Sequence, residues 1–299
     1  SAPPLALTPG LDVYRFYALA RDGARALFST YPHSEERLYV VPTDASVPPL
    51  DLAGSGIPTG FAATFFWQVE LTGDGQRVVF LRAEDDDSYV QCELWSARLD
   101  GTSLVQLNPG PRIALTEFRL APDGARVVYI DGDPIAFAYS ELVAARTDGA
   151  SWRILTPGVE RPGAFRISDD SVFCVFGSRE AGLTSLRLDR LDSSQPFELL
   201  APSSATISDL ELVRGSTTAV FLSQGVLYSL ASPNDPVPVS GPGVTAFATI
   251  GFPYLAFSLD GSQLLYRSDE SAAGVYDLYA APVDGSAPPR QLNPPLSGE

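Results

Sequence analysis

The feature that most constrains the fold is a pair of short apolar segments joined by a turn, which recurs roughly every 45 to 50 residues. Asp-Gly occupies most of these turns. It favours tight hairpins because glycine adopts a positive φ without steric cost and aspartate hydrogen-bonds its own backbone. A fixed period of this length is typical of repeat architectures. The copies are "ALARDGARALFS" from Ala18, "ELTGDGQRVVFL" from Glu70, "RLAPDGARVVYI" from Arg119, "RISDDSVFCVFG" from Arg166, "AFSLDGSQLLYR" from Ala256 and a degenerate "VRGS" near Gly215.

A second turn follows each first turn after roughly 22 to 26 residues, as in "RLDGTS" (98–103), "RTDGAS" (146–151) and "PVDGSA" (282–287). An alternating segment such as "ELWSARL" precedes it, and a short segment such as "LVQLNPG" follows it. Apolar residues alternate with period two, and no segment sustains the 3.6-residue period of a helix. Each unit therefore predicts four strands.

One four-stranded antiparallel unit cannot bury both of its faces, whereas radial packing of several units can. We therefore predict an all-β fold, a six-bladed β-propeller of four-stranded antiparallel blades, with residues 1–299 forming a single domain. The expected blades are residues 11–54, 61–110, 113–158, 162–202, 206–243 and 252–295.

The first ten residues, "SAPPLALTPG", are similar to the fourth-strand segment "SAPPRQLNPP" at 286–295. Residues 1–10 are therefore expected to form an extra outer strand. Either this strand latches onto the last blade, or one propeller has been cut from a longer repetitive chain. The same residues lack the charged start and long apolar core of a signal peptide, so we expect a cytosolic chain or a mature or trimmed form.

Composition excludes several classes of protein. The formal charge is −16 and every basic residue is arginine, so the surface repels phosphate backbones and nucleic acid is not an expected partner. Apolar residues make up 45% of the chain, which excludes general disorder. No apolar run approaches the roughly 18 residues of a membrane span, so no membrane insertion is expected. Cys92 and Cys174 occupy different repeats and different repeat positions, so no disulfide is expected.

The pattern "xPDGxxVVY…ELWxxxxDGxxxxQLTPG" resembles the TolB-type propeller repeat, a relative of the WD-repeat class. The resemblance covers nearly the whole chain and is poorest in the fifth repeat, where the Asp-Gly turns are lost. It implies a periplasmic or secreted propeller that is used for binding. It transfers no catalytic residues.

The loops between the second and third strands share one rim, where loops on a rigid scaffold usually carry function. They are rich in acids: "TYPHSEER" (30–37), "RAEDDDSYVQCE" (82–93), "DGDPIAFAYSE" (131–141), "GSREAG" (177–182) and "RSDESAAGVYD" (267–277). Converging carboxylates could bind Ca²⁺, which takes six to eight oxygen ligands, although no loop fits the calcium-loop pattern and solvated loops are the alternative. The candidate metal ligands are Asp85, Asp86, Asp87, Asp131, Asp133 and Asp269. Tyr31 and Tyr276 are among the aromatic residues of this rim, which either cap blade edges or form a contact surface.

The first strands of the repeats carry a column of charged residues. An apolar column, Tyr17, Val69, Phe118, Phe165, Leu210 and Leu255, separates two more polar ones. Strand alternation is expected to send the apolar column between blades and the polar ones toward a central channel. These charges are expected to contact one another or water, as a balanced ring or as a site for a small zwitterion or a peptide terminus. The candidate ligand-binding residues are Glu70, Glu117, Arg119, Arg166, Asp209 and Glu211.

Catalytic signatures are sparse. His33 is the sole histidine and no G-x-S-x-G elbow is present, so we expect no nucleophilic triad and no zinc site. We therefore predict a non-enzymatic, monomeric binding or scaffold module that presents its acidic loop face and channel mouth to a protein or peptide. Two alternatives stay open. One is a hydrolase or lyase that uses top-face carboxylates, with or without Ca²⁺. The other is a calcium-stabilised structural module of a larger surface protein.

Overall fold

The chain divides into two compact units, Ser1–Pro157 and Gly158–Glu299, each with its own sheets. The computed structural model describes residues 5–31, 36–52, 64–86, 89–108, 112–113, 117–132, 140–156, 161–180, 183–192, 197–203, 207–231, 235–242, 244 and 255–293. Within these residues no helix is long and apolar enough to cross a membrane.

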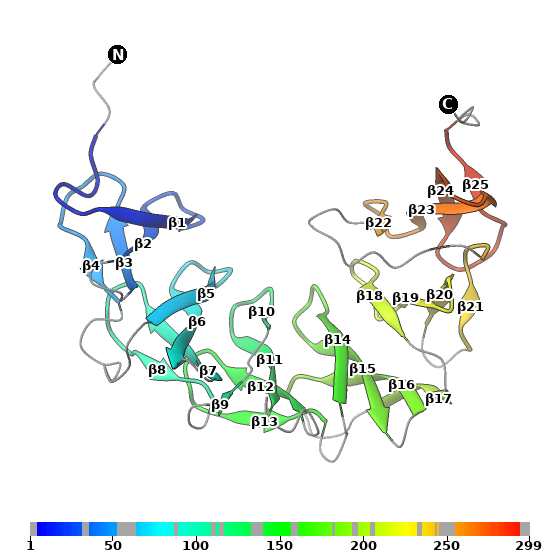
Figure 1. Cartoon of the computed structure of the whole chain (residues 1–299), viewed down its shortest axis with the longest axis horizontal. Helices are drawn as coiled ribbons and strands as arrows, with labels where there is room; N and C mark the ends of the chain where they lie inside the picture. The colour runs from blue at the N-terminus through cyan, green and yellow to red at the C-terminus, as the bar shows by residue number, and fades with distance from the viewer. Residues whose placement is uncertain are drawn as a thin grey trace. The chain divides into compact units, whose positions relative to one another are not determined.

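Unit 1 contains three antiparallel sheets whose strands pair in chain order (Figure 1). Sheet 1 comprises β1 (Val13–Leu19), β2 (Arg25–Thr30), β3 (Arg37–Pro42) and β4 (Leu50–Asp51). Sheet 2 comprises β5 (Thr64–Leu71), β6 (Arg77–Asp86), β7 (Tyr89–Arg98) and β8 (Val105–Gln106), and β9 (Arg112–Ile113) pairs with β7 as a fifth strand. Sheet 3 comprises β10 (Phe118–Leu120), β11 (Arg126–Gly132), β12 (Ser140–Arg146) and β13 (Trp152–Ile154).

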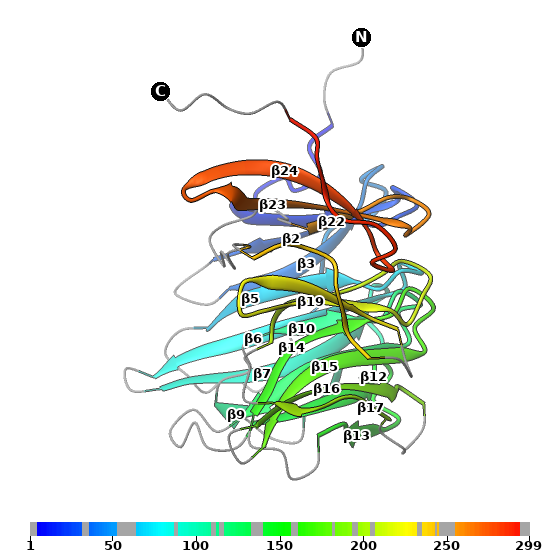
Figure 2. The ribbon, with the colours of Figure 1, turned by 90° about the vertical axis from the view of Figure 1, so that its right-hand side faces the viewer.

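Unit 2 repeats the same arrangement three times, and β14, β15 and β16 lie side by side in Figure 2. Sheet 4 comprises β14 (Arg161–Ile167), β15 (Phe173–Glu180), β16 (Leu183–Arg190) and β17 (Phe197–Ser203). Sheet 5 comprises β18 (Ser208–Leu212), β19 (Ala219–Ser223), β20 (Val226–Leu230) and β21 (Val237–Pro238). Sheet 6 comprises β22 (Leu255–Phe257), β23 (Gln263–Ala272), β24 (Val275–Pro282) and β25 (Arg290–Gln291). The prediction of an all-β chain with six four-stranded antiparallel repeats is confirmed.

Alternation along the strands builds the cores between neighbouring sheets. Val78 and Phe80 of β6 pack with Leu27 and Leu38 of sheet 1. The intervening Val79 and Leu81 pack instead with Phe118 and Tyr129 of sheet 3. Sheet 5 is likewise packed on both faces, against sheet 4 around Phe221 and against sheet 6 around Leu222. Burial of alternate residues on opposite faces is what the period-two pattern requires.

The repeated turns have the predicted geometry. The glycines of the first turns, including Gly23 and Gly124, have φ of 69° and 71°, and each turn aspartate accepts a backbone hydrogen bond two residues on. Ser171 takes the same left-handed conformation, with φ of 61°, where the fourth repeat lacks glycine. In the fifth repeat the Ser216 hydroxyl accepts from the Thr218 N–H at 2.8 Å in place of an aspartate. The degenerate sequence therefore still closes a hairpin.

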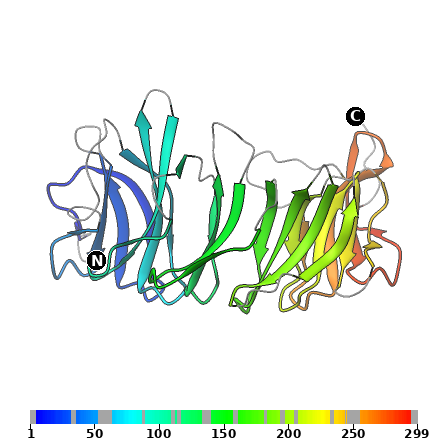
Figure 3. The ribbon, with the colours of Figure 1, turned by 90° about the horizontal axis from the view of Figure 1, so that it is seen from below.

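Two acidic segments expected as loops are mostly strand. β6 and β7 continue the ladder as far as the Asp86–Tyr89 pair, and this long hairpin is cyan in Figure 3. β23 and β24 likewise extend to the Ala272–Val275 pair. Main-chain pairing satisfies the backbone polar groups there, so polar side chains do not prevent strand formation.

The N-terminal segment differs from its expected form over the residues that can be described. Leu5–Gly10 form no strand, and Leu7 packs against the sheet 1 cluster of Ala26, Phe28 and Val41. Residues 1–4 lie outside the described residues. The latch onto the last blade therefore stays a prediction.

Candidate functional site

The first strands of the sheets carry the predicted polar and apolar columns. Phe118, Phe165 and Leu210 of the apolar column are at most 1% exposed. Phe118 and Leu210 belong to the cores between neighbouring sheets. The flanking polar positions therefore lie on the opposite side of each strand from these cores.

In unit 1 the polar column is tied to neighbouring groups. The Gln68 amide donates to the Glu70 carboxylate at 2.5 Å and to the Phe118 carbonyl at 2.9 Å, which joins β5 to β10. Glu117 and Arg119 form an ion pair at 2.6 Å, with both side chains about two-fifths exposed. These charges contact one another, as expected.

In unit 2 the same column forms a two-pronged ion pair between β14 and β18. Arg166 Nε and Nη2 donate to the two oxygens of Glu211 at 2.9 and 2.6 Å. Its Nη1 donates to the Phe165 carbonyl at 2.8 Å. Planar pairs of this kind fix both partners in orientation.

Asp209 is the unusual member of the column. It lies in a bulge of β18, between the paired residues Ser208 and Glu211, with φ of 48°. Among the described residues it is the one non-glycine with positive φ inside a strand. Although Asp209 is exposed, partial desolvation raises the pKa of its carboxyl; Arg166 opposes this rise and the nearby Glu211 carboxylate adds to it. Strained, perturbed acids of this kind cluster at functional sites, so Asp209 is a candidate proton-transfer group.

The candidate calcium ligands are not brought together within the described residues. Asp131 is buried on β11, and Asp269 accepts from the Gly274 N–H of its own hairpin at 2.9 Å. Asp85 and Asp86 lie on β6, but their side chains are outside the described part, as are Asp87 and Asp133 altogether. No group of three metal-ligating side chains is found where the structure describes them. Calcium binding stays a prediction.

An exposed aromatic surface on unit 1 escaped the sequence analysis, apart from Tyr31. It consists of Tyr14 and Tyr31, which are 52% and 43% exposed and whose rings contact each other; Phe16 and Trp67 are also exposed, at 61% and 49%. Tyr14 and Phe16 lie on β1, Tyr31 follows β2, and Trp67 sits at a bulge in β5. The Arg15 guanidinium donates to the Phe66 carbonyl at 3.2 Å and so joins β1 to β5. Phe16 holds the first-strand position that Gln68 and Glu117 hold in the next two repeats, whereas no repeat signal marks Tyr14 or Trp67.

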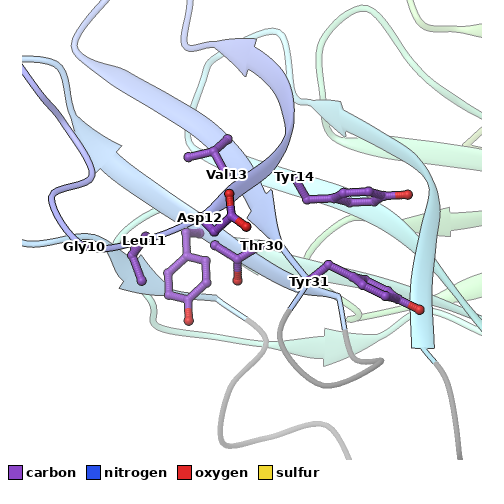
Figure 4. Close-up of a pocket in the computed structure, with 8 residues that line it drawn as sticks. Gly10, Leu11, Asp12, Val13, Tyr14, Thr30 and Tyr31 are labelled. Carbon is purple, nitrogen blue, oxygen red and sulfur yellow. The ribbon is translucent and has the colours of Figure 1, made fainter.

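A cavity of about 390 Å³ adjoins this surface where β1 begins and β2 ends (Figure 4). The Tyr14 and Tyr31 rings lie one above the other, with centroids 5.2 Å apart and planes 34° apart. Among the described residues, Asp12 is the one charged residue in its lining. The remaining lining residues are Gly10, Leu11, Val13, Thr30 and Tyr39. The Val13–Thr30 pair places the cavity at the end of sheet 1 opposite the Asp22 turn, which is the rim of the variable loops.

A buried carboxylate supports the same end of sheet 1. Glu36 accepts from Tyr17 Oη at 2.7 Å, Ser29 Oγ at 2.5 Å and the Phe66 N–H at 2.8 Å. Burial raises the pKa of the Tyr17 hydroxyl, and its hydrogen bond to Glu36 adds to the rise. These contacts join sheets 1 and 2 beneath the aromatic surface. His33 of the adjoining loop lies outside the described residues.

Comparisons with known proteins show the fold alone. No family model and no curated protein matches the sequence. An oligogalacturonate lyase in complex with manganese is similar in structure, with 15% identity and a TM-score of 0.56 over 88% of this chain and 87% of that one. The Dos1 propeller is similar with 12% identity and a TM-score of 0.54 over 91% and 67%. TolB from Acinetobacter baumannii is a distant neighbour, with 14% identity and a TM-score of 0.42 over 88% and 62%. The chain thus has the β-propeller fold of four-stranded antiparallel sheets.

Proposed function

We propose that the protein is a non-enzymatic binding module that holds a protein or peptide partner on the aromatic surface of unit 1. The observation that carries this proposal is a pair of half-exposed tyrosines, Tyr14 and Tyr31, which contact each other and line a cavity on the loop rim. Isolated exposed apolar residues are ordinary, whereas a contiguous aromatic patch is typical of an interaction site. Tyrosine and tryptophan are enriched in interfaces because they combine a large apolar body with a polar group.

Rigid support favours the same role. The Tyr14 and Tyr31 rings contact each other at a tilt of 34°, and β1 is tied to β5 through Arg15 and Glu36. A surface that is already ordered loses little side-chain entropy when a partner binds. The repeated turns lie on the opposite rim, whereas the loops of this rim differ in sequence from one repeat to the next.

Peptide selection against the immobilised protein tests the proposal. Enriched peptides are expected to bind Tyr14→Leu and Tyr31→Leu about tenfold more weakly, since aromatic anchors contribute more than 1 kcal/mol each. The matched control is Trp152→Leu, because Trp152 is 52% exposed on β13 and lies outside the surface. Fluorescence anisotropy gives the dissociation constants. No enrichment, or peptides that bind all three variants equally, would overturn the proposal.

A second candidate function is a hydrolase or lyase in which Asp209 transfers a proton. Its raised pKa and strained backbone favour this role, and one structural neighbour is an oligogalacturonate lyase. The candidate ranks second because a chain of charge −16 repels an acidic polymer. Incubation with oligogalacturonate, followed by ultraviolet absorbance of the unsaturated product, tests it. Turnover that Asp209→Asn abolishes and Asp235→Asn preserves would support it, and absence of product would remove this substrate class.

A further inference from the structure

The cavity beside Tyr14 and Tyr31 has the volume of a ligand site, and its lining favours one sign of charge. Its volume of about 390 Å³ lies within the range of roughly 300 to 1,000 Å³ that small-molecule sites occupy. Three tyrosines and one carboxylate supply most of its specific chemistry. Tyrosine faces carry negative electrostatic potential, so both kinds of group favour a positive ligand.

The charged groups around the cavity leave a net negative field. In the described part of unit 1 they are Asp12 in the lining, Arg15 on β1, the buried Glu36, and the Arg37–Asp51 ion pair, whose members lie opposite Thr30 and Tyr39 in the ladder. The hydrogen bond to the Tyr14 hydroxyl and, more weakly, the charge of Glu36 raise the pKa of Arg15, because each stabilises the guanidinium. Of these charged groups Asp12 is the one that lines the cavity, so its carboxylate is placed to meet a ligand.

The chain itself places a guanidinium over one ring of this pair, that of Tyr14. The Arg15 Cζ lies 4.9 Å from the Tyr14 ring centroid, and its Nη2 is 3.4 Å from the Tyr14 hydroxyl. Arg15 is not among the described residues that line the cavity, whereas Tyr14 and Tyr31 both are. Guanidinium stacks on aromatic faces and pairs with carboxylates through a planar fork, which an ammonium group does not have.

We propose that this cavity binds the arginine side chain of a basic peptide, with the guanidinium on the Tyr14–Tyr31 pair and paired with Asp12. This inference rests on the proposed binding function and names its ligand class. The charge of −16 adds long-range attraction for such a peptide, so association is expected to slow as salt is added.

The test uses N-acetyl-arginine-N-methylamide as the probe and its neutral citrulline analogue as the matched control. Amide chemical shifts of the ¹⁵N-labelled protein are followed during each titration. The arginine probe is expected to shift the amides of Asp12, Tyr14 and Thr30, and the citrulline probe is not. Asp12→Asn is expected to weaken binding about fivefold, the upper range for an exposed ion pair.

Asp22→Asn is the control variant, because it removes the same charge from the opposite rim of sheet 1 and asparagine can still accept the turn hydrogen bond from the Ala24 N–H. Equal shifts with citrulline, or equal affinity of Asp12→Asn and wild type, would overturn the arginine assignment. If selected peptides bind the aromatic surface but contain no essential arginine, this inference fails while the proposed function stands. If no peptide binds that surface, both fail.

Discussion

At the scale of single residues, Glu36 makes the contacts that matter most for unit 1. The sequence "TYPHSEER" indicates only an acidic loop, because nothing local reveals that Phe66, 30 residues on, donates to this carboxylate. Glu36 is instead 4% exposed and accepts three hydrogen bonds. Contacts between sheets arise from tertiary packing, so sequence patterning could not predict them.

Glu36→Gln is therefore expected to destabilise the protein by about 1–3 kcal/mol, because the amide places a donor where Tyr17, Ser29 or the Phe66 N–H also donates. Urea unfolding followed by circular dichroism measures the change. Glu117→Gln is the control, since its exposed ion pair with Arg119 is expected to contribute at most about 1 kcal/mol. Equal effects of the two substitutions would contradict the role assigned to Glu36.

The aspartates of the turns are expected to make the folded protein less stable in acid. The Arg146 ion pair lowers the pKa of Asp148 to about 2, and the Ser258 hydroxyl lowers that of Asp260 to about 2. Because the pKa of each carboxyl is lower in the folded protein than its unfolded value near 3.8, the ionised carboxylates stabilise the folded protein at pH values above 3.8. This stabilisation is lost as the pH falls toward 2. Unfolding free energy is therefore expected to drop between about pH 5 and pH 2. Asp148→Asn with Asp260→Asn should flatten the drop, and an equally steep profile in that variant would refute this origin.

At the scale of elements, the repeats encode their own strands well. Period-two alternation and the Asp-Gly turns predict the hairpins, and even the degenerate turn at Gly215 closes, with φ of 68°. The bulge at Asp209 and the short strand β9 were not predictable. Both depend on how one strand registers against its neighbour, which residue pattern alone does not set.

Two turn glycines allow the cost of a left-handed backbone to be measured separately from the cost of a steric clash. Both have φ near 70°, but nothing lies within 4 Å of a Cβ placed on Gly23, whereas one on Gly124 would lie 2.7 Å from Thr72 Cβ. Gly23→Ala is expected to cost about 1–2 kcal/mol, the penalty of left-handed backbone. Gly124→Ala is expected to cost more, because the Thr72–Gly73 turn must also move. Thermal unfolding of both variants checks this, and equal melting temperatures would contradict the close packing of neighbouring turns.

At the scale of the whole molecule, the sequence repeat predicts the fold but does not indicate the proposed binding site. Six copies of one pattern give six sheets, and solved propellers share that architecture at 12–15% identity. The charged column of first strands is also visible in the repeat, because its members hold equivalent positions. Tyr14 and Asp12 have no equivalents in other repeats, so only the folded chain shows that they line one cavity with Tyr31.

Photo-crosslinking tests the central claim most directly, because it maps where a bound peptide lies. A selected peptide with a benzophenone beside its arginine is irradiated with the protein, and mass spectrometry locates the adducts. We expect them within residues 10–16 and 30–39, and we expect excess unlabelled peptide to suppress them. Adducts on the opposite rim, around Asp22, or scattered over both units would show that the aromatic surface is not the binding site.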